Sequence, residues 1–176
     1  RAEDCSVQMS RQRRAAYTPV RESMTQPADI PSHWPWRAFS RRLDVRGTHW
    51  HIQQHGAGPD LLLVHGTGGS THSWAPALDA LATRFRVLAI DLPGHGFTTG
   101  GPLGGDRYAL PTMARALGDL LDHLGVRPTL AAGHSAGVPI LLQLACEQRI
   151  APARIVGFNA ALVPPPQLYL SLIAPL

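Results

Sequence analysis

Residues 129–142 read Thr-Leu-Ala-Ala-Gly-His-Ser-Ala-Gly-Val-Pro-Ile-Leu-Leu, and this stretch decides the fold. Its first four residues predict a buried strand, and the residues from Val138 onward predict a helix. Gly133 to Gly137 lie between them and match G-x-S-x-G, a sharp strand-to-helix turn that raises a serine to the edge of a sheet. Ser135 is therefore a candidate nucleophile, and the start of the helix favours negative charge that develops beside it.

A glycine-rich loop at residues 65–70, His-Gly-Thr-Gly-Gly-Ser, is the second motif. It directly follows the apolar run Asp60–Val64, which predicts a strand buried on both faces. Glycines at this point let backbone N–H groups face a reacting centre, so the amides of Thr67 and Ala136 are predicted to form an oxyanion hole. A phosphate-binding loop is the alternative, but the chain contains no lysine and the glycine spacing does not fit that motif.

A third motif, Asp91 to Thr98, reads Asp-Leu-Pro-Gly-His-Gly-Phe-Thr and follows a predicted strand at 85–91. The three motifs, in this order and spacing, resemble those of the α/β-hydrolases over residues 37–166. Asp91 and His95 could serve as catalytic partners of Ser135. The resemblance instead implies that both shape the loop.

The remaining pattern predicts an α/β fold with a mainly parallel sheet and an N-terminal antiparallel hairpin. Leu43 and Val45 alternate before a turn at Arg46-Gly47, and the chain returns through residues 48–53. The other predicted elements are helices at 73–83, 110–124 and 136–148 and strands at 128–133 and 154–162.

The chain lacks the remaining members of a catalytic triad. On the α/β-hydrolase fold the order is serine, acid, histidine, yet Glu147 is the only acid after Ser135 and no histidine follows it. His134 is expected to pack or hydrogen bond beneath the turn, and Glu147 to face solvent. We therefore interpret the chain as the N-terminal part of the fold, with residues 167–176 starting a cap. This part alone is expected to be inactive, and a full-length form to be a serine hydrolase.

Several short stretches of the sequence carry a closer resemblance. They are residues 34–41, 65–68, 71–74, 91–98, 133–137 and 159–162. Together they resemble the magnesium-chelatase accessory proteins of bacteriochlorophyll synthesis. The resemblance implies a role near metal insertion into a porphyrin, a porphyrin or ester as substrate, and magnesium-chelatase subunits as partners. A non-enzymatic porphyrin- or chelatase-binding protein remains an alternative, as does a general esterase or carbon–carbon-bond hydrolase.

Residues 1–36 are predicted to be a basic, disordered leader that ends in an anchor formed by Trp34 and Trp36. Residues 1–46 contain nine arginines and five acids. We expect a solvated tail with at most weak contact with an anionic membrane surface, and no nucleic-acid partner. The leader also lacks the apolar stretch of a signal peptide.

Metal and redox chemistry have weak support in the sequence. Cys5 and Cys146 show no metal-ligand spacing, which favours a reducing, cytoplasmic compartment. His49 and His51 share one strand face and could form a metal pair, but no third ligand is evident and we expect an exposed hairpin face. No cofactor or metal is predicted.

Overall fold

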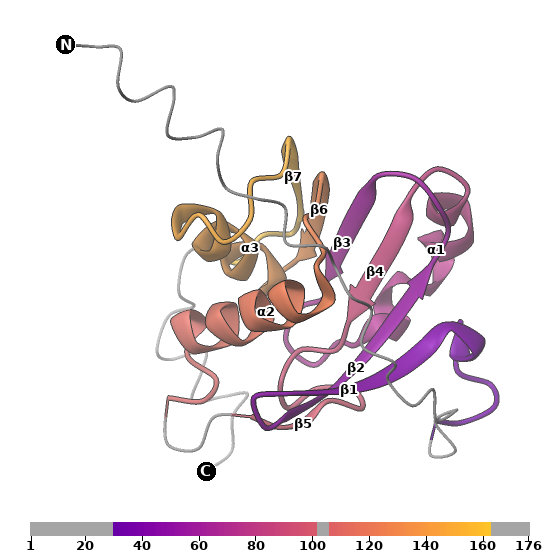
Figure 1. Ribbon diagram of the computed structural model, residues 1–176, viewed down its shortest axis with the longest axis horizontal. Coiled ribbons are helices and arrows are strands. Elements are labelled where there is room, and N and C mark those ends of the chain that lie inside the picture. Colours follow the sequence, from indigo (N-terminus) through magenta and orange to yellow (C-terminus); the bar gives the residue numbers. More distant parts are fainter. Residues whose placement is uncertain (1–29, 102–105, 163–176) are drawn as a thin grey trace.

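The computed structural model describes residues 30–101 and 106–162, which form a seven-stranded sheet with helices on both faces (Figure 1). The strand order is β1-β2-β4-β3-β6-β7, and β5 pairs with β2. The predicted α/β class, with a hairpin followed by parallel strands, is confirmed. Within the described residues, no helix is long and apolar enough to cross a membrane.

The N-terminal hairpin consists of β1 (Ser40–Val45) and β2 (Thr48–His55). Arg46 and Gly47 both have positive φ, 52° and 76°, as a two-residue hairpin turn requires. β2 also pairs antiparallel with β4 and with β5 (Thr99–Gly100), so the sheet is mixed. The pattern did not predict β5, because two residues are too few to show a strand period.

The parallel part consists of β3 (Asp60–Val64), β4 (Arg86–Ile90), β6 (Leu130–His134) and β7 (Arg154–Phe158). Three crossover helices connect these strands in chain order: α1 (Ala75–Ala82), α2 (Leu110–Leu124) and α3 (Gly137–Cys146). Parallel neighbours align their carboxyl ends at one edge of the sheet, so the loops that follow β3, β4 and β6 meet there.

Several predicted boundaries were wrong by a few residues. The helix expected at 73–83 is a 3-10 turn, η3 (Thr71–Trp74), followed by α1, which has a proline in its first turn. α3 ends before Gln148, which has a φ of 56°, and β7 ends before Asn159, which has a φ of 46°. Each positive φ turns the chain out of its helix or strand.

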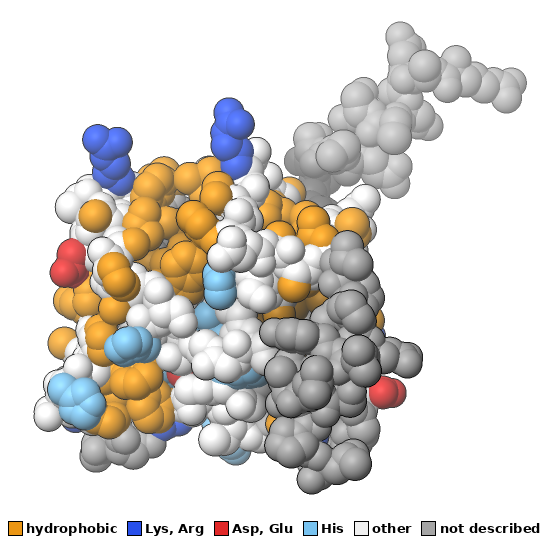
Figure 2. All heavy atoms as spheres, turned by 180° about the vertical axis from the view of Figure 1, so that it is seen from behind, with side chains coloured by type: hydrophobic (Ala, Val, Ile, Leu, Met, Phe, Trp, Pro, Cys, Tyr) orange, Lys and Arg blue, Asp and Glu red, His pale blue; other side chains and the backbone are white. Residues whose placement is uncertain are grey.

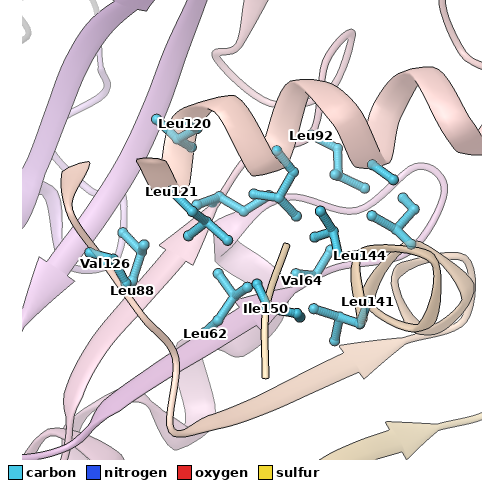
Figure 3. Close-up of a cluster of buried hydrophobic side chains, with 14 of the residues drawn as sticks. Leu62, Val64, Leu88, Leu92, Leu120, Leu121, Val126, Leu141, Leu144 and Ile150 are labelled. Atoms are coloured by element: carbon cyan, nitrogen blue, oxygen red, sulfur yellow. The ribbon is translucent and has the colours of Figure 1, made fainter. Parts of the chain in front are cut away.

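The core fills both faces of the sheet. Leu62 and Val64 point toward α2 and α3, where they join the larger cluster (Figure 3), whereas Leu61 and Leu63 face Leu78 of α1. This alternation explains why the apolar run of β3 is continuous, since both of its faces are covered.

Beside β7, the described part of the chain leaves large apolar side chains exposed. Val156, Phe158 and Leu162 are 47%, 50% and 61% exposed, and Figure 2 shows a broad band of hydrophobic side chains on the side hidden in Figure 1. Residues 1–29 and 163–176 lie outside the described part, so the predictions of a disordered leader and of a cap at 167–176 stay predictions.

Both tryptophans that precede η2 (Arg37–Phe39) contact the domain. The indole N–H of Trp34 donates to Thr71 Oγ1 at 3.4 Å, and its ring meets that of Phe97 edge-on at 4.8 Å. The indole N–H of Trp36 donates to the carboxylate of Asp79. The segment before β1 is therefore held against η3, the loop after β4 and helix α1.

Candidate active site

Ser135 occupies the turn between β6 and α3 with a φ of 48°, a region that residues other than glycine seldom adopt. Three backbone hydrogen bonds hold this conformation. The Ser135 N–H donates to the carbonyl of Phe158 at 2.9 Å, and its carbonyl accepts from Val138 and Ala161, both at 3.2 Å. The strained serine is thus fixed by the start of α3 and by the chain that leaves β7, as a nucleophile elbow requires.

The glycines around Ser135 are required by close backbone approach. A Cβ on Gly133 would lie 2.9 Å from the backbone of Val138, and one on Gly137 would collide with the carbonyl oxygen of Val64. A Cβ on Gly66 would lie 2.8 Å from the Ser135 Cβ. The glycine-rich loop that follows β3 therefore lies directly against the serine.

His65 fixes the peptide between Gly66 and Thr67. Its Nε2 accepts the N–H of Leu92 at 2.9 Å, so Nδ1 carries the proton and donates to the Gly66 carbonyl at 2.7 Å. The Gly69 N–H donates to the same oxygen at 3.0 Å. Because C=O and N–H point in opposite directions across a trans peptide, the Thr67 N–H is directed away from His65.

The surroundings of His65 favour its neutral form, which the hydrogen bonds with Leu92 and Gly66 require. Burial lowers the pKa of His65 below its ordinary value of 6.5, and the neighbouring His95 and His134 lower it further. The hydrogen bond to Gly66 and the charge of Asp91 act in the opposite direction without reversing the shift. A neutral His65 keeps its acceptor for Leu92 and its donor for Gly66.

The two residues whose amides are predicted to form the oxyanion hole line the same pocket. Thr67 and Ala136 both line a cavity of about 370 Å³ at the carboxyl edge of the sheet. The His95 Nδ1 lies 3.1 Å from the Pro93 carbonyl, which can only accept, so Nδ1 carries a proton. The other lining residues are Leu92, Gly94, His95, Tyr108, Met113 and Ile140.

Asp91 shapes the loop after β4. Its carboxylate is buried and accepts hydrogen bonds from the Thr71 N–H at 2.6 Å, the Phe97 N–H at 2.8 Å and His51 Nδ1 at 2.7 Å. Burial acts to raise the pKa of Asp91, but the hydrogen bond and charge of His51, together with the two amides, lower it. The carboxylate therefore ties together β2, η3 and its own loop, the loop-shaping role that the resemblance implied.

His51 corrects one expectation. The exposed hairpin face was predicted for His49 and His51, but the His51 side chain is completely buried and its Nε2 lies 3.0 Å from Ser40 Oγ. His49 is exposed and its Nδ1 lies 2.9 Å from the Asp44 carboxylate. The loop that carries Asp91 covers β2 at His51, which strand periodicity could not reveal. No cluster of three metal-ligating side chains occurs in residues 30–101 and 106–162.

His134 is a second correction. It was expected to pack beneath the turn, but it is exposed at the end of β6, because the turn at Ser135 leaves its side uncovered in the described part.

Glu147 faces solvent as expected and accepts from Gln143 Nε2 at 2.6 Å. Glu147 is separated from Ser135 by the whole of α3, whose ten residues span about 15 Å, so it does not lie beside the serine. Among the described residues, no base hydrogen bonds to the Ser135 hydroxyl.

The chain matches the α/β-hydrolase fold family over residues 59–166. It belongs to that family. It is 41% identical over 138 residues to the magnesium-chelatase 30 kDa subunit of Rhodobacter capsulatus, covering 77% of this chain and 47% of that protein. It is also 34% identical over 131 residues to a pimeloyl-[acyl-carrier protein] methyl ester esterase of Aeromonas hydrophila, covering 63% of this chain and 50% of the esterase.

Solved structures agree with the fold assignment. An α/β-hydrolase fold protein from Burkholderia ambifaria superposes with a TM-score of 0.64 at 27% identity, over 72% of this chain and 46% of that one. Cfl2 from Burkholderia cenocepacia gives the same TM-score and identity over 76% of this chain and 48% of its own. The chain thus spans about half the length of these relatives.

Proposed function

We propose that this chain is the nucleophile-bearing part of a serine-hydrolase-type protein that assists magnesium chelatase in bacteriochlorophyll synthesis. One observation carries the chemical half of the proposal: Ser135, at a φ of 48°, lies against Gly66, and the Thr67 and Ala136 residues beside it line one pocket. The pathway half rests on the 41% identity to the magnesium-chelatase 30 kDa subunit.

In the proposed reaction, Ser135 Oγ attacks an ester-like carbonyl in the pocket while a base takes its proton. The tetrahedral adduct then breaks its C–O bond to the leaving alcohol, which takes the proton back from the base, and water later hydrolyses the acyl-serine. The amides of Thr67 and Ala136 stabilise the negative charge that develops on the carbonyl oxygen. His65 acts through these groups, because its hydrogen bond to the Gly66 carbonyl orients the Thr67 amide. The acid and the base come from outside the described residues, and without a base the serine hydroxyl is a poor nucleophile.

The experiment has two parts. Sequencing the DNA beyond codon 176 shows whether the frame continues to an acid and a later histidine. The product of the complete reading frame is then treated with a fluorophosphonate probe, which we expect to label Ser135. Ser135→Ala should abolish labelling, and the exposed Ser32→Ala variant should leave it unchanged. Labelling that persists in Ser135→Ala would refute the assignment.

The pathway half needs a separate measurement. A pull-down of the complete product with magnesium-chelatase subunits should recover a complex, and deletion of the gene should lower bacteriochlorophyll content. Normal pigment in the deletion strain would contradict this half and leave a general esterase or carbon–carbon-bond hydrolase, which the similarity to the methyl ester esterase favours.

A non-enzymatic porphyrin- or chelatase-binding protein is the second candidate. It is favoured because no base contacts Ser135 within the described ranges, 30–101 and 106–162. Tight porphyrin binding by a complete product that no fluorophosphonate labels would establish it in place of the hydrolase.

A further inference from the structure

A second pocket adjoins the one that Thr67 and Ala136 line. It measures about 350 Å³ and shares Gly94 and Tyr108 with the first pocket, so these two residues lie between neighbouring cavities. The first pocket has the apolar side chains Leu92, Met113 and Ile140 on its wall. The second is lined, besides the shared pair, by Gly96, Thr98, Thr99, Gly100, Gly101 and Arg107.

The boundary between the pockets is built by a close contact. Gly94 has a φ of 77°, and a Cβ there would lie 2.6 Å from Tyr108 Cε1 and 2.8 Å from the Tyr108 hydroxyl. Only glycine permits both the backbone conformation and the approach of the ring. The Tyr108 ring is therefore held against the Asp91–Thr98 loop although the residue is 55% exposed.

Arg107 is placed by the same ring. Its guanidinium carbon lies 5.3 Å from the centroid of the Tyr108 ring, a cation–π distance. Among the described residues, no acidic side chain lines this pocket. The second pocket therefore offers a guanidinium held at a tyrosine ring with no carboxylate on the described wall, whereas the arginines at 127 and 149 are paired with aspartates.

We propose that the Arg107 pocket binds a carboxylate of the substrate. This deepens the proposed function and rests on it: the substrate class becomes an ester with an apolar body, bound in the first pocket, and a free carboxylate that reaches Arg107. A guanidinium pairs with a carboxylate through two parallel hydrogen bonds, which gives direction as well as charge. Tyr108 determines specificity by holding Arg107 beside the pocket.

The test uses the product of the complete reading frame and pairs of p-nitrophenyl esters of matched acyl lengths. Each pair has one neutral acyl chain and one that ends in a carboxylate. For at least one length, the wild type should prefer the acidic ester, and Arg107→Ala should reduce this preference by about tenfold or more in kcat/KM. Arg107→Lys should restore part of it, and the matched exposed control Arg84→Ala should leave it unchanged.

The outcomes separate the subsite from the reaction. Hydrolysis of neutral esters without a preference that depends on Arg107 would overturn the subsite and leave the hydrolase proposal standing. If no ester is hydrolysed, binding of a monomethyl dicarboxylate to Ser135→Ala, measured by calorimetry, tests the subsite alone. Arg107→Ala should weaken this binding about tenfold or more. Equal binding by the two proteins would overturn the subsite.

Discussion

Two serines of this molecule have opposite surroundings. Ser40 Oγ lies 3.0 Å from His51 Nε2, and His51 Nδ1 lies 2.7 Å from the Asp91 carboxylate. All three residue types of a catalytic triad are therefore present and joined by hydrogen bonds. Ser135 has no such partners in the described part of the chain. Yet Ser40 is buried on an ordinary strand, whereas Ser135 is half-buried at a φ of 48° beside a pocket.

The comparison shows that residue types joined by hydrogen bonds do not make an active site. The Ser40 hydroxyl accepts from Gln53 Nε2 at 3.1 Å while it contacts His51, and Asp91 is occupied by two backbone amides. No substrate carbonyl can reach a serine enclosed in this way. The Ser40 cluster therefore stabilises the fold, whereas the Ser135 elbow gives up backbone stability to expose its hydroxyl.

Removing the carboxylate at the centre of the buried cluster should have the largest effect on stability. Asp91→Ala leaves His51 and the amides of Thr71 and Phe97 without their acceptor. We expect a loss of about 3–5 kcal/mol in the free energy of unfolding, measured by urea denaturation. The control Asp79→Ala, which removes an exposed acceptor of Trp36, should lose little. Similar losses in the two variants would contradict the structural role of Asp91.

Lowering the pH should reduce the free energy of unfolding in two stages, first through His65 and then through Asp91. His65 has a pKa below its ordinary 6.5, so its contribution to stability is present above pH 6.5 and is lost as the pH falls through the folded value. Asp91 has a pKa below its ordinary 3.8, so its contribution is present above pH 3.8 and is lost at lower pH still. Urea denaturation at a series of pH values should show the His65 stage disappear in His65→Gln.

The low-pH stage should disappear separately. Asp91→Asn should flatten the unfolding free energy below pH 3.8 while it retains the stage that begins near pH 6.5. Loss of both stages in one variant would mean that the two groups titrate as a single unit.

Ser40→Ala should have the smallest effect. Loss of the hydroxyl removes one acceptor of Gln53 and the contact with His51, and we expect a destabilisation of about 1–3 kcal/mol. Fluorophosphonate labelling of Ser135 in the complete product should keep its wild-type rate, as intact-protein mass spectrometry can show. A phosphonylated Ser40, or a rate that falls with Ser40→Ala, would contradict the distinction between the two serines.

The sequence predicted the features of the site that depend on short stretches of chain. The turn from β6 to α3, the glycines at 133 and 137 and the loop after β3 all follow from neighbours in sequence and from the alignment of parallel strands. That Glu147 is the only acid and that no histidine follows Ser135 in these 176 residues could also be read from the sequence. Helix and strand ends were less predictable, because glutamine gives no signal for the positive φ that Gln148 adopts after α3.

What the tertiary structure decided depends on contacts between distant segments. The sequence predicts the G-x-S-x-G turn because a buried strand, the turn and a helix follow one another within a few residues. It cannot show that the Asp91 loop buries His51, that His134 stays exposed, or that the Tyr108 ring lies on Gly94 and carries Arg107 beside a pocket. Burial and charge pairing are properties of packing, and residues dozens of positions apart determine them together.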